Sequence, residues 1–223
     1  MSFFITLIET TDASRRELEA IPKMNSMLTR GLALAEYKAF LHDLYYIVWH
    51  FCPIMGAAAS RCDDRFRNVR YELYERIEEE KNHETWVLED VEAIQGDVAA
   101  IRANPPSPPV QAMIAFNYYC ADRAHPCSVV GMLYSLEVIA SAYAATLAQS
   151  IAKSIGRDMD GPGFKFLLSH SAMDQDHVAK LNVLVKTIED PLAQESIVNA
   201  TRINFYQFGR MFYEEGFASL IPG

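Results

Sequence analysis

Apolar side chains recur along this chain at the three- and four-residue spacing of amphipathic helices. No stretch between turn signals shows the strict alternation of apolar and polar residues that marks a half-buried strand. The segment 34–51 illustrates the helical spacing with Phe40, Leu41, Leu44, Ile47, Val48 and Phe51. The pattern therefore predicts an all-α protein.

Prolines, glycines and capping residues set the expected bounds of these helices. We expect helices over residues 12–21, 34–51, 65–94, 110–124, 126–156, 164–189 and 192–217. Pro53 is expected to stop the second helix, and the Pro- and Gly-rich segments 104–109 and 156–163 are expected to be loops. The opening FFITLI is expected to be a packed arm. With half of the 223 residues apolar and no internal repeat, we expect one helical domain over residues 1–223.

Charge and cysteine content narrow the class of protein. The formal net charge of −9 argues against a nucleic-acid partner, which would require clustered Lys and Arg. The four cysteines form no Cys-x-x-Cys pair, and the start of the chain lacks a basic region followed by a cleavage site. We therefore expect a cytoplasmic protein.

The segment 127–148 is nearly all apolar or small and about as long as a membrane span. Glu137 lies near its middle, where a lone carboxylate in a bilayer would be costly, and no Lys or Arg closes either end tightly. The segment is therefore interpreted as a buried helix of a protein without a membrane partner.

The strongest chemical signal is His170, Asp174 and His177, which recur at i, i+4 and i+7 and so share one helix face. Imidazole nitrogens together with a carboxylate suit a first-row metal ion such as Fe(II). Three solvated polar residues are the alternative, but Phe166 and Leu181 are among the apolar residues that frame this face. We predict a metal site.

Two further signals supply carboxylates. Glu80 and His83 form a Glu-x-x-His pair, as in carboxylate-bridged dimetal bundles, although Glu79 could take the place of Glu80. Glu137 would be costly to bury without a partner, which could be a metal ion or the hydroxyl of Tyr134. The predicted ligand set is Glu80, His83, Glu137, His170, Asp174 and His177, enough for two metal ions with open positions.

Aromatic residues are the candidate substrate contacts, although aromatic stripes at helical spacing are more often core. The candidate pocket residues are Tyr45, Tyr46, Trp49, Tyr118, Phe205 and Phe208. Arg202, with Arg210 or Lys180 as alternatives, could bind a substrate carboxylate.

The run EEEKNHETW at 78–86, Glu137 and the run HSAMDQDHV at 170–178 together resemble the haem-oxygenase-like diiron oxidases and oxygenases, relatives of the TenA and PqqC fold. The resemblance implies a seven-helix bundle, two iron ions, O₂ as co-substrate, a homodimer, and a bridging role for Glu137. One departure stands out, because some members place a Glu seven residues before the His, where this chain has Arg76.

The expected activity is that of an O₂-dependent non-haem diiron oxidase or oxygenase in specialised metabolism. Its substrate would be an amino acid or a fatty-acid-like carboxylate, converted by oxidative C–C or C–N cleavage or by N-oxygenation, and an external electron donor is a candidate partner. A metal-independent TenA-like hydrolase, a PqqC-like cofactor-free oxidase and a metal-storing or partner-binding bundle are the alternatives.

Overall fold

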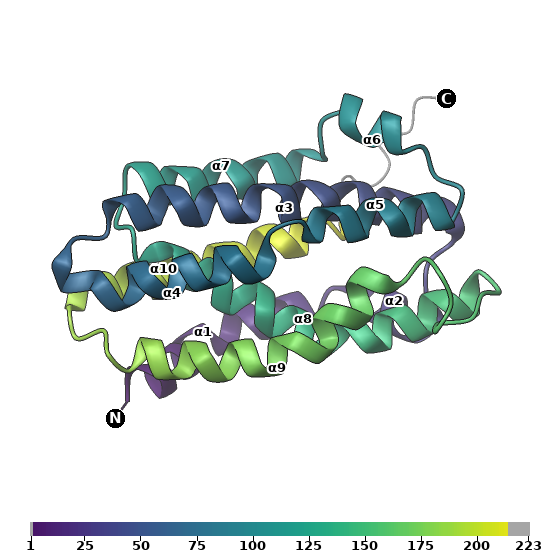
Figure 1. The fold of residues 1–223 in the computed structure, drawn as a ribbon. Helices are drawn as coiled ribbons and strands as arrows, with labels where there is room; N and C mark the ends of the chain where they lie inside the picture. Colours follow the sequence, from purple (N-terminus) through teal and green to yellow (C-terminus); the bar gives the residue numbers. More distant parts are fainter. Residues whose placement is uncertain (1, 214–223) are drawn as a thin grey trace.

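The computed structural model describes residues 2–213, except for the side chains of Asp174 and Gln175. Within these residues the chain forms ten α-helices and one short 3-10 helix, arranged as an elongated bundle (Figure 1). The helices are α1 (Phe3–Glu19), α2 (Pro22–Arg30), α3 (Leu34–Arg61), α4 (Arg67–Glu80), α5 (His83–Ala93), α6 (Val98–Ala103), α7 (Pro108–Asp122), α8 (Ser128–Ser154), α9 (Lys165–Val185) and α10 (Pro191–Arg210), with the 3-10 helix η1 (Asp64–Phe66) before α4. The all-α prediction is confirmed for this part of the chain.

Helix α8 is the core of the bundle, where it packs against α9, α10, α2 and α7. Gly131 allows the close approach of α10, because a Cβ atom there would lie 2.4 Å from the carbonyl oxygen of Ile197. Among the described helices, α8 alone is long and apolar enough to cross a membrane by length and composition. Its position between other helices fits the predicted buried helix.

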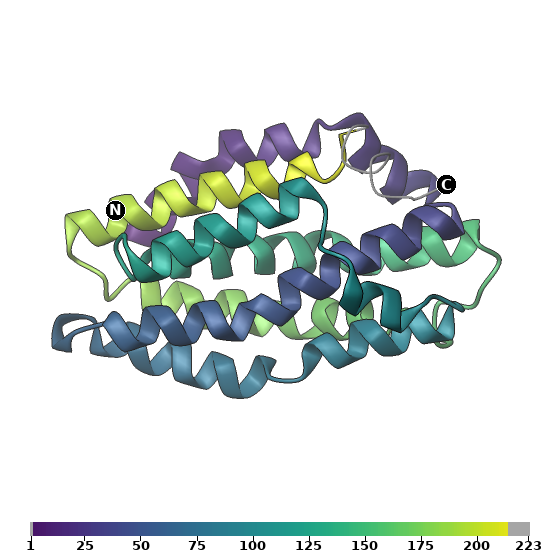
Figure 2. The same ribbon diagram turned by 90° about the horizontal axis from the view of Figure 1, so that it is seen from above.

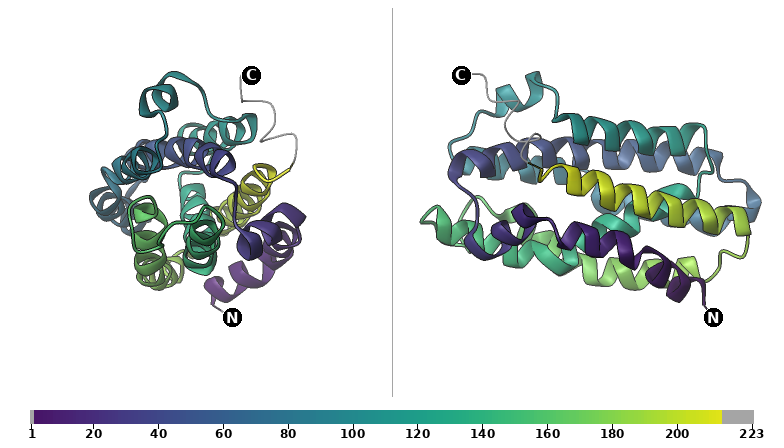
Figure 3. Two further views of the ribbon diagram at one scale, coloured as in Figure 1. Left: turned by 90° about the vertical axis from the view of Figure 1, so that its right-hand side faces the viewer. Right: turned by 180° about the vertical axis from the view of Figure 1, so that it is seen from behind.

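The bundle viewed along its length shows α1, α2 and α10 on one side and α4 and α5 on the other, with α8 and α9 between them (Figure 3). Helix α3 contacts both α4 and α5, and α5 contacts α9. Residues from the Glu80 segment and the His170 segment can therefore meet inside the bundle.

The N-terminal segment differs from the expectation of an arm followed by a helix at 12–21. Helix α1 already begins at Phe3, because Leu7, Thr11 and Leu18 are buried at helical spacing on the side that faces α10. Helix α2 was not expected. Pro22 stands at its start and Gly31, with φ of 77°, ends it.

Pro53 does not end α3, which continues to Arg61. A proline inside a helix removes one backbone hydrogen bond, but Ile54, Met55, Ala58 and Ala59 beyond it are all buried. The packing of this second half offsets the local cost, so the expected stop was wrong.

The expected helix over 65–94 is instead divided into α4 and α5 by a turn at Lys81 and Asn82 (Figure 2). Asn82 has φ of 71°, in the left-handed region that asparagine tolerates better than most residues. Helix α6 is a further short helix that was not expected. The last helix ends at Arg210 rather than 217, and residues 214–217 lie outside the described residues.

Candidate metal centre

The turn between α4 and α5 places two buried side chains next to each other. Glu80 is the last residue of α4 and His83 is the first of α5, and Nδ1 of His83 lies 2.8 Å from Oε2 of Glu80. The Glu-x-x-His pair therefore meets across a helix break and not within one helix. The left-handed Asn82 makes this arrangement possible.

His170 of α9 completes a compact group of donors. Its Nε2 lies 3.3 Å from Nδ1 of His83 and 3.5 Å from Oε2 of Glu80. Ligand atoms of Glu80, His83 and His170 all lie within 4.8 Å of one another, and all three residues are buried. We call these three residues the first donor group.

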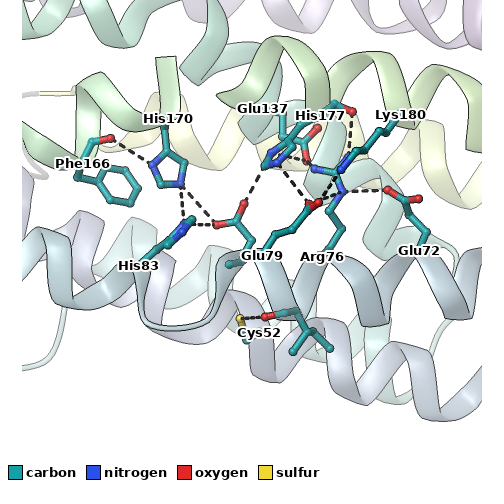
Figure 4. Close-up of polar contacts among 12 residues, drawn as sticks. Cys52, Glu72, Arg76, Glu79, His83, Glu137, Phe166, His170, His177 and Lys180 are labelled. Atoms are coloured by element: carbon teal, nitrogen blue, oxygen red, sulfur yellow. Dashed lines mark hydrogen bonds and ion pairs between the residues drawn. The ribbon is translucent and has the colours of Figure 1, made fainter. Parts of the chain in front are cut away.

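The orientation of His170 is set by its surroundings. Its Nδ1 lies 3.1 Å from the carbonyl oxygen of Phe166, which can only accept, so Nδ1 donates and Nε2 is the nitrogen left to face Glu80 and His83 (Figure 4). The imidazole also stacks on the Phe166 ring at 4.0 Å between centroids. The ring is therefore held in the way of a metal-binding histidine, with one nitrogen bonded to a backbone carbonyl and the other turned towards the remaining donors.

Asp90 joins the two helices that carry these histidines. Its carboxylate, on α5, accepts hydrogen bonds from the backbone N–H groups of Lys165 and Phe166 at 2.8 and 2.9 Å. N–H groups at the start of a helix have no acceptor within that helix, so Asp90 caps α9 from a neighbouring helix. Burial raises the pKa of Asp90, while the two N–H groups act in the opposite direction.

The charge of Glu80 follows from its neighbours. Burial alone would raise its pKa, but hydrogen bonds from His170 and His83 and their positive charge lower the pKa to about 2. Glu80 is therefore an ionised carboxylate inside the bundle, held by groups that can exchange a proton for a metal ion.

A second group of donors lies beside the first. Nδ1 of His177 is 3.7 Å from Oε1 of Glu80 and 4.0 Å from Oε1 of Glu137, and all three side chains are buried. We call Glu137 and His177 the second donor group. Glu80 lies between the two groups, with one oxygen near each of them.

Arg76 lies against the second donor group and is only 1% exposed. Its Nη1 donates to Oε1 of Glu137 at 2.7 Å, and its Nη2 donates to the carbonyl oxygen of His177 at 2.9 Å. Its Nε donates to Glu72 at 2.9 Å (Figure 4). The guanidinium is thus fixed by hydrogen bonds at all three of its nitrogens.

The structure separates Glu79 from Glu80. Glu79 is 32% exposed and ion-paired with Lys180, and its Oε2 lies 3.4 Å from Nε2 of His177. Of these two glutamates, only Glu80 contacts His83 and His170, which favours Glu80 as the first carboxylate ligand. Asp174 lies within α9, but its side chain is outside the described residues, so its predicted role stays a prediction. The bridging role implied for Glu137 also stays a prediction, since Glu80 is the carboxylate between the groups here.

The donor chemistry of these residues fits iron. One carboxylate and two imidazoles in the first group are oxygen and nitrogen donors that suit Fe(II), and Glu137 and His177 add donors of the same two kinds. The fit is closer for one ion than for two, because the carboxylate of the second group is already paired with Arg76.

An apolar cavity adjoins the donors, with an empty volume of about 860 Å³, open solvent included. Glu80, Glu137 and His170 form part of its wall. The remaining lining residues are Met24, Met27, Phe40, Leu44, Ile47, Val48, Phe51, Leu136, Ile139, Ala140, Tyr143, Ala144, Leu147, Phe166, Leu167, Phe208 and Phe212. Except for Tyr143 these are all apolar, so the cavity suits a hydrocarbon group.

Most of the predicted substrate contacts lie outside this cavity, and their role in binding stays a prediction. Of the residues proposed for the pocket, only Phe208 belongs to the cavity wall, whereas Tyr45, Tyr46, Trp49, Tyr118, Phe205 and Arg202 do not. The hydroxyl of Tyr46 donates to backbone carbonyls of the 101–104 segment, Tyr118 contacts His50, and Trp49 is exposed. Arg202 donates to the carbonyl oxygen of Thr10.

The two alternatives proposed for binding a carboxylate are also engaged elsewhere. Lys180 is paired with Glu79, and the guanidinium of Arg210 lies over the ring of Tyr213. Asp90 and the pairing of Arg76 were not predicted. The only sequence signal for Arg76 was its position seven residues before His83, where some members of the resembling family have a Glu.

The fold and the donors define a haem-oxygenase-like helical protein, and solved structures support this class. A protein of Shewanella denitrificans with a haem-oxygenase-like fold has a TM-score of 0.83 at 18% identity, over 95% of this chain and 90% of that one. A TenA homologue of Pseudomonas syringae gives 0.79 at 14% identity, over 98% and 93%. Haem oxygenase-1 of Synechocystis, solved with haem, gives 0.75 at 17% identity, over 95% and 91%. At these identities the likeness concerns the fold.

Within this class the chain belongs to the family of iron-containing redox enzymes, whose model matches residues 38–205. That range includes all six predicted ligands. No curated protein matches the chain in sequence.

Proposed function

We propose that this protein is an O₂-dependent non-haem diiron oxidase or oxygenase that acts on a fatty-acid-like carboxylate. The observation that carries the proposal is that three buried donors, Glu80, His83 and His170, converge, and that Glu80 and His170 line an apolar cavity. Membership of the iron-containing redox enzymes supports iron as the metal. The number of iron ions and the substrate are part of the proposal.

The protein's own residues would hold the metal and exclude water. Glu80, His83 and His170 would bind the first ion, and Glu137 and His177, with Asp174, would bind the second. Iron held there would supply the reactivity toward O₂ that no side chain of this chain offers. Asp90 and Phe166 keep His170 in place, and the apolar wall keeps bulk water from the reacting atoms.

The cavity favours a fatty-acid-like substrate over an amino acid. An amino acid brings an ammonium group that needs a free carboxylate, whereas Glu80 is bonded to histidines and Glu137 to Arg76. A hydrocarbon chain can fill the space between Leu44, Ala140 and Phe208, whose burial of apolar surface would contribute to binding. The carboxylate end would then lie towards the metal donors.

The metal-independent alternatives are less well supported. A hydrolase of the TenA type would need a cysteine nucleophile in the cavity, and no cysteine is among the described residues that line it. A storage or partner-binding bundle would not need an apolar cavity beside the donors. An oxidative enzyme accounts for both the convergent donors and the apolar cavity beside them.

The test is an anaerobic Fe(II) titration followed by mixing with O₂ in the presence of saturated fatty acids of increasing length or of amino acids. We expect O₂ consumption that depends on both iron and a fatty acid, and its loss in His170→Ala but not in His42→Ala, which lies away from the donors. Unchanged iron binding in His170→Ala would contradict the metal site. Stimulation by amino acids alone would overturn the substrate class.

A cavity variant tests the substrate orientation. Ala140→Phe, which fills part of the cavity, should shift the preferred chain to a shorter fatty acid. Ala145→Phe, on the exposed side of the same helix, should leave the preference unchanged. The cytoplasmic location, the homodimer and the external electron donor stay part of the proposal and call for fractionation, sedimentation and reductase assays.

A further inference from the structure

Arg76 is a permanent cation inside a group of predicted metal ligands. It lies one helical turn before Glu80 and one turn after Glu72 on α4, so all three side chains share a face of that helix. This places the guanidinium directly beside the second donor group. In the first donor group, the carboxylate of Glu80 lies against the imidazoles of His83 and His170 instead.

The bonds of Arg76 involve the same atoms that a second ion would need. Oε1 of Glu137 accepts from Nη1 of Arg76 at 2.7 Å, and this oxygen is also the one 4.0 Å from Nδ1 of His177. Nη2 fixes the backbone of α9 at His177. A divalent ion bound to this oxygen would either displace the guanidinium or lie close to its charge, and like charges repel strongly where water is excluded.

The first donor group has no comparable obstacle. The groups bonded to Glu80 are two imidazoles, whose nitrogens can themselves bind a metal, whereas the guanidinium of Arg76 keeps its charge and offers no lone pair. Only in the second group, therefore, must a carboxylate give up its bond to a permanently charged side chain before an ion can bind.

We propose that Arg76 is a built-in competitor for the second metal position, so that the two irons load unequally. The first ion binds at Glu80, His83 and His170 with Arg76 in place, and the second binds only when Glu137 exchanges its bond to Arg76 for the ion. This inference rests on the proposed function, because it concerns the second ion of the proposed pair. Arg76 is a positioning residue in this account and contacts no substrate.

The experiment is an anaerobic titration of the chelator-treated protein with Fe(II) and, separately, with Co(II), read by bound metal after equilibrium dialysis and by the visible bands of cobalt. The wild type should bind one equivalent tightly and a second at least about tenfold more weakly. Arg76→Gln, which keeps polarity and removes charge, should tighten the second step by about tenfold or more and leave the first nearly unchanged. Arg76→Lys, which keeps the charge, should behave like the wild type.

Thermal unfolding gives a second measurement on the same proteins. Metal should raise the Tm of Arg76→Gln by more than it raises that of the wild type, because the ion replaces the missing cation at Glu137. Glu137→Gln, a near-isosteric change for use if Arg76→Gln fails to fold, should keep the first binding step and lose the second.

The outcomes separate this inference from the proposed function. If the wild type binds metal but the second step is unchanged or weakened in Arg76→Gln, the role of Arg76 alone is overturned. Loss of the first step in Glu137→Gln would have the same consequence. Absence of metal binding in the wild type and in Arg76→Gln would overturn both the diiron proposal and this inference.

Discussion

The two donor groups differ in the kind of side chain that is bonded to their carboxylate. In the first, Glu80 is bonded to the imidazoles of His83 and His170, and in the second, Glu137 is bonded to the guanidinium of Arg76. Imidazole is neutral near pH 7 when it binds a metal, while guanidinium keeps its charge. Similar ligand types can therefore form an open metal position in one place and a structural ion pair a few ångströms away.

The helices that carry the two groups are also anchored differently. Asp90 links α5 to the start of α9 and so supports the first group, whereas Arg76 links α4 to α8 and to α9 at the second. One anchor is a helix cap outside the donors. The other is an ion pair with a donor itself, so metal binding and bundle stability are coupled at the second group.

The largest expected effect on stability comes from the second group. Arg76→Gln should destabilise the metal-free protein by about 3 kcal/mol, because it leaves the buried carboxylate of Glu137 without its guanidinium. Urea unfolding with and without Glu137→Gln in the same chain measures the coupling. If the double variant is no more stable than the additive sum of the single changes, the ion pair does not matter energetically.

The next effect concerns the first group. His83→Ala or His170→Ala should weaken binding of the first ion by more than about 100-fold, since even changes to residues behind a ligand can cost 10- to 100-fold. Equilibrium dialysis measures the loss, with His42→Ala as the matched control. Equal weakening in all three variants would show that the effect is not specific to the donors.

A smaller effect is expected from the helix cap. Asp90→Ala should cost about 1–2 kcal/mol of stability and weaken the first ion by about tenfold, because α9 and His170 lose their anchor. Asp97→Ala removes the carboxylate that caps α6 from its own N-terminus, away from the donors. That control should lose stability in chemical unfolding and keep its metal affinity.

The smallest effect is expected at the turn between α4 and α5. Asn82→Ala should cost about 1 kcal/mol, because alanine is strained at φ of 71°, whereas Asn82→Gly should cost little. If the alanine variant alone has a lower Tm and binds the first ion more weakly, the turn is needed to align Glu80 and His83. Similar values in both variants would separate the turn from the alignment of Glu80 and His83.

Much of this site could be predicted from the sequence by itself. Helical spacing identified the all-α class, placed His170 and His177 on one face, and made Glu137 an unusual carboxylate in an apolar helix. These conclusions depend on local periodicity, which the chain encodes within a few turns.

Only the tertiary structure decided the features that depend on contacts between distant segments. Pro53 lies inside a helix because residues beyond it are buried against neighbouring helices, and the helix over 65–94 breaks where Glu80 and His83 turn inward. The cavity wall comes from six helices and Phe212, so a stripe on one helix could not reveal it. Glu80 rather than Glu79 meets His83 and His170, and Arg76 meets Glu137 across 61 positions of sequence, because packing brings α4, α5, α8 and α9 together.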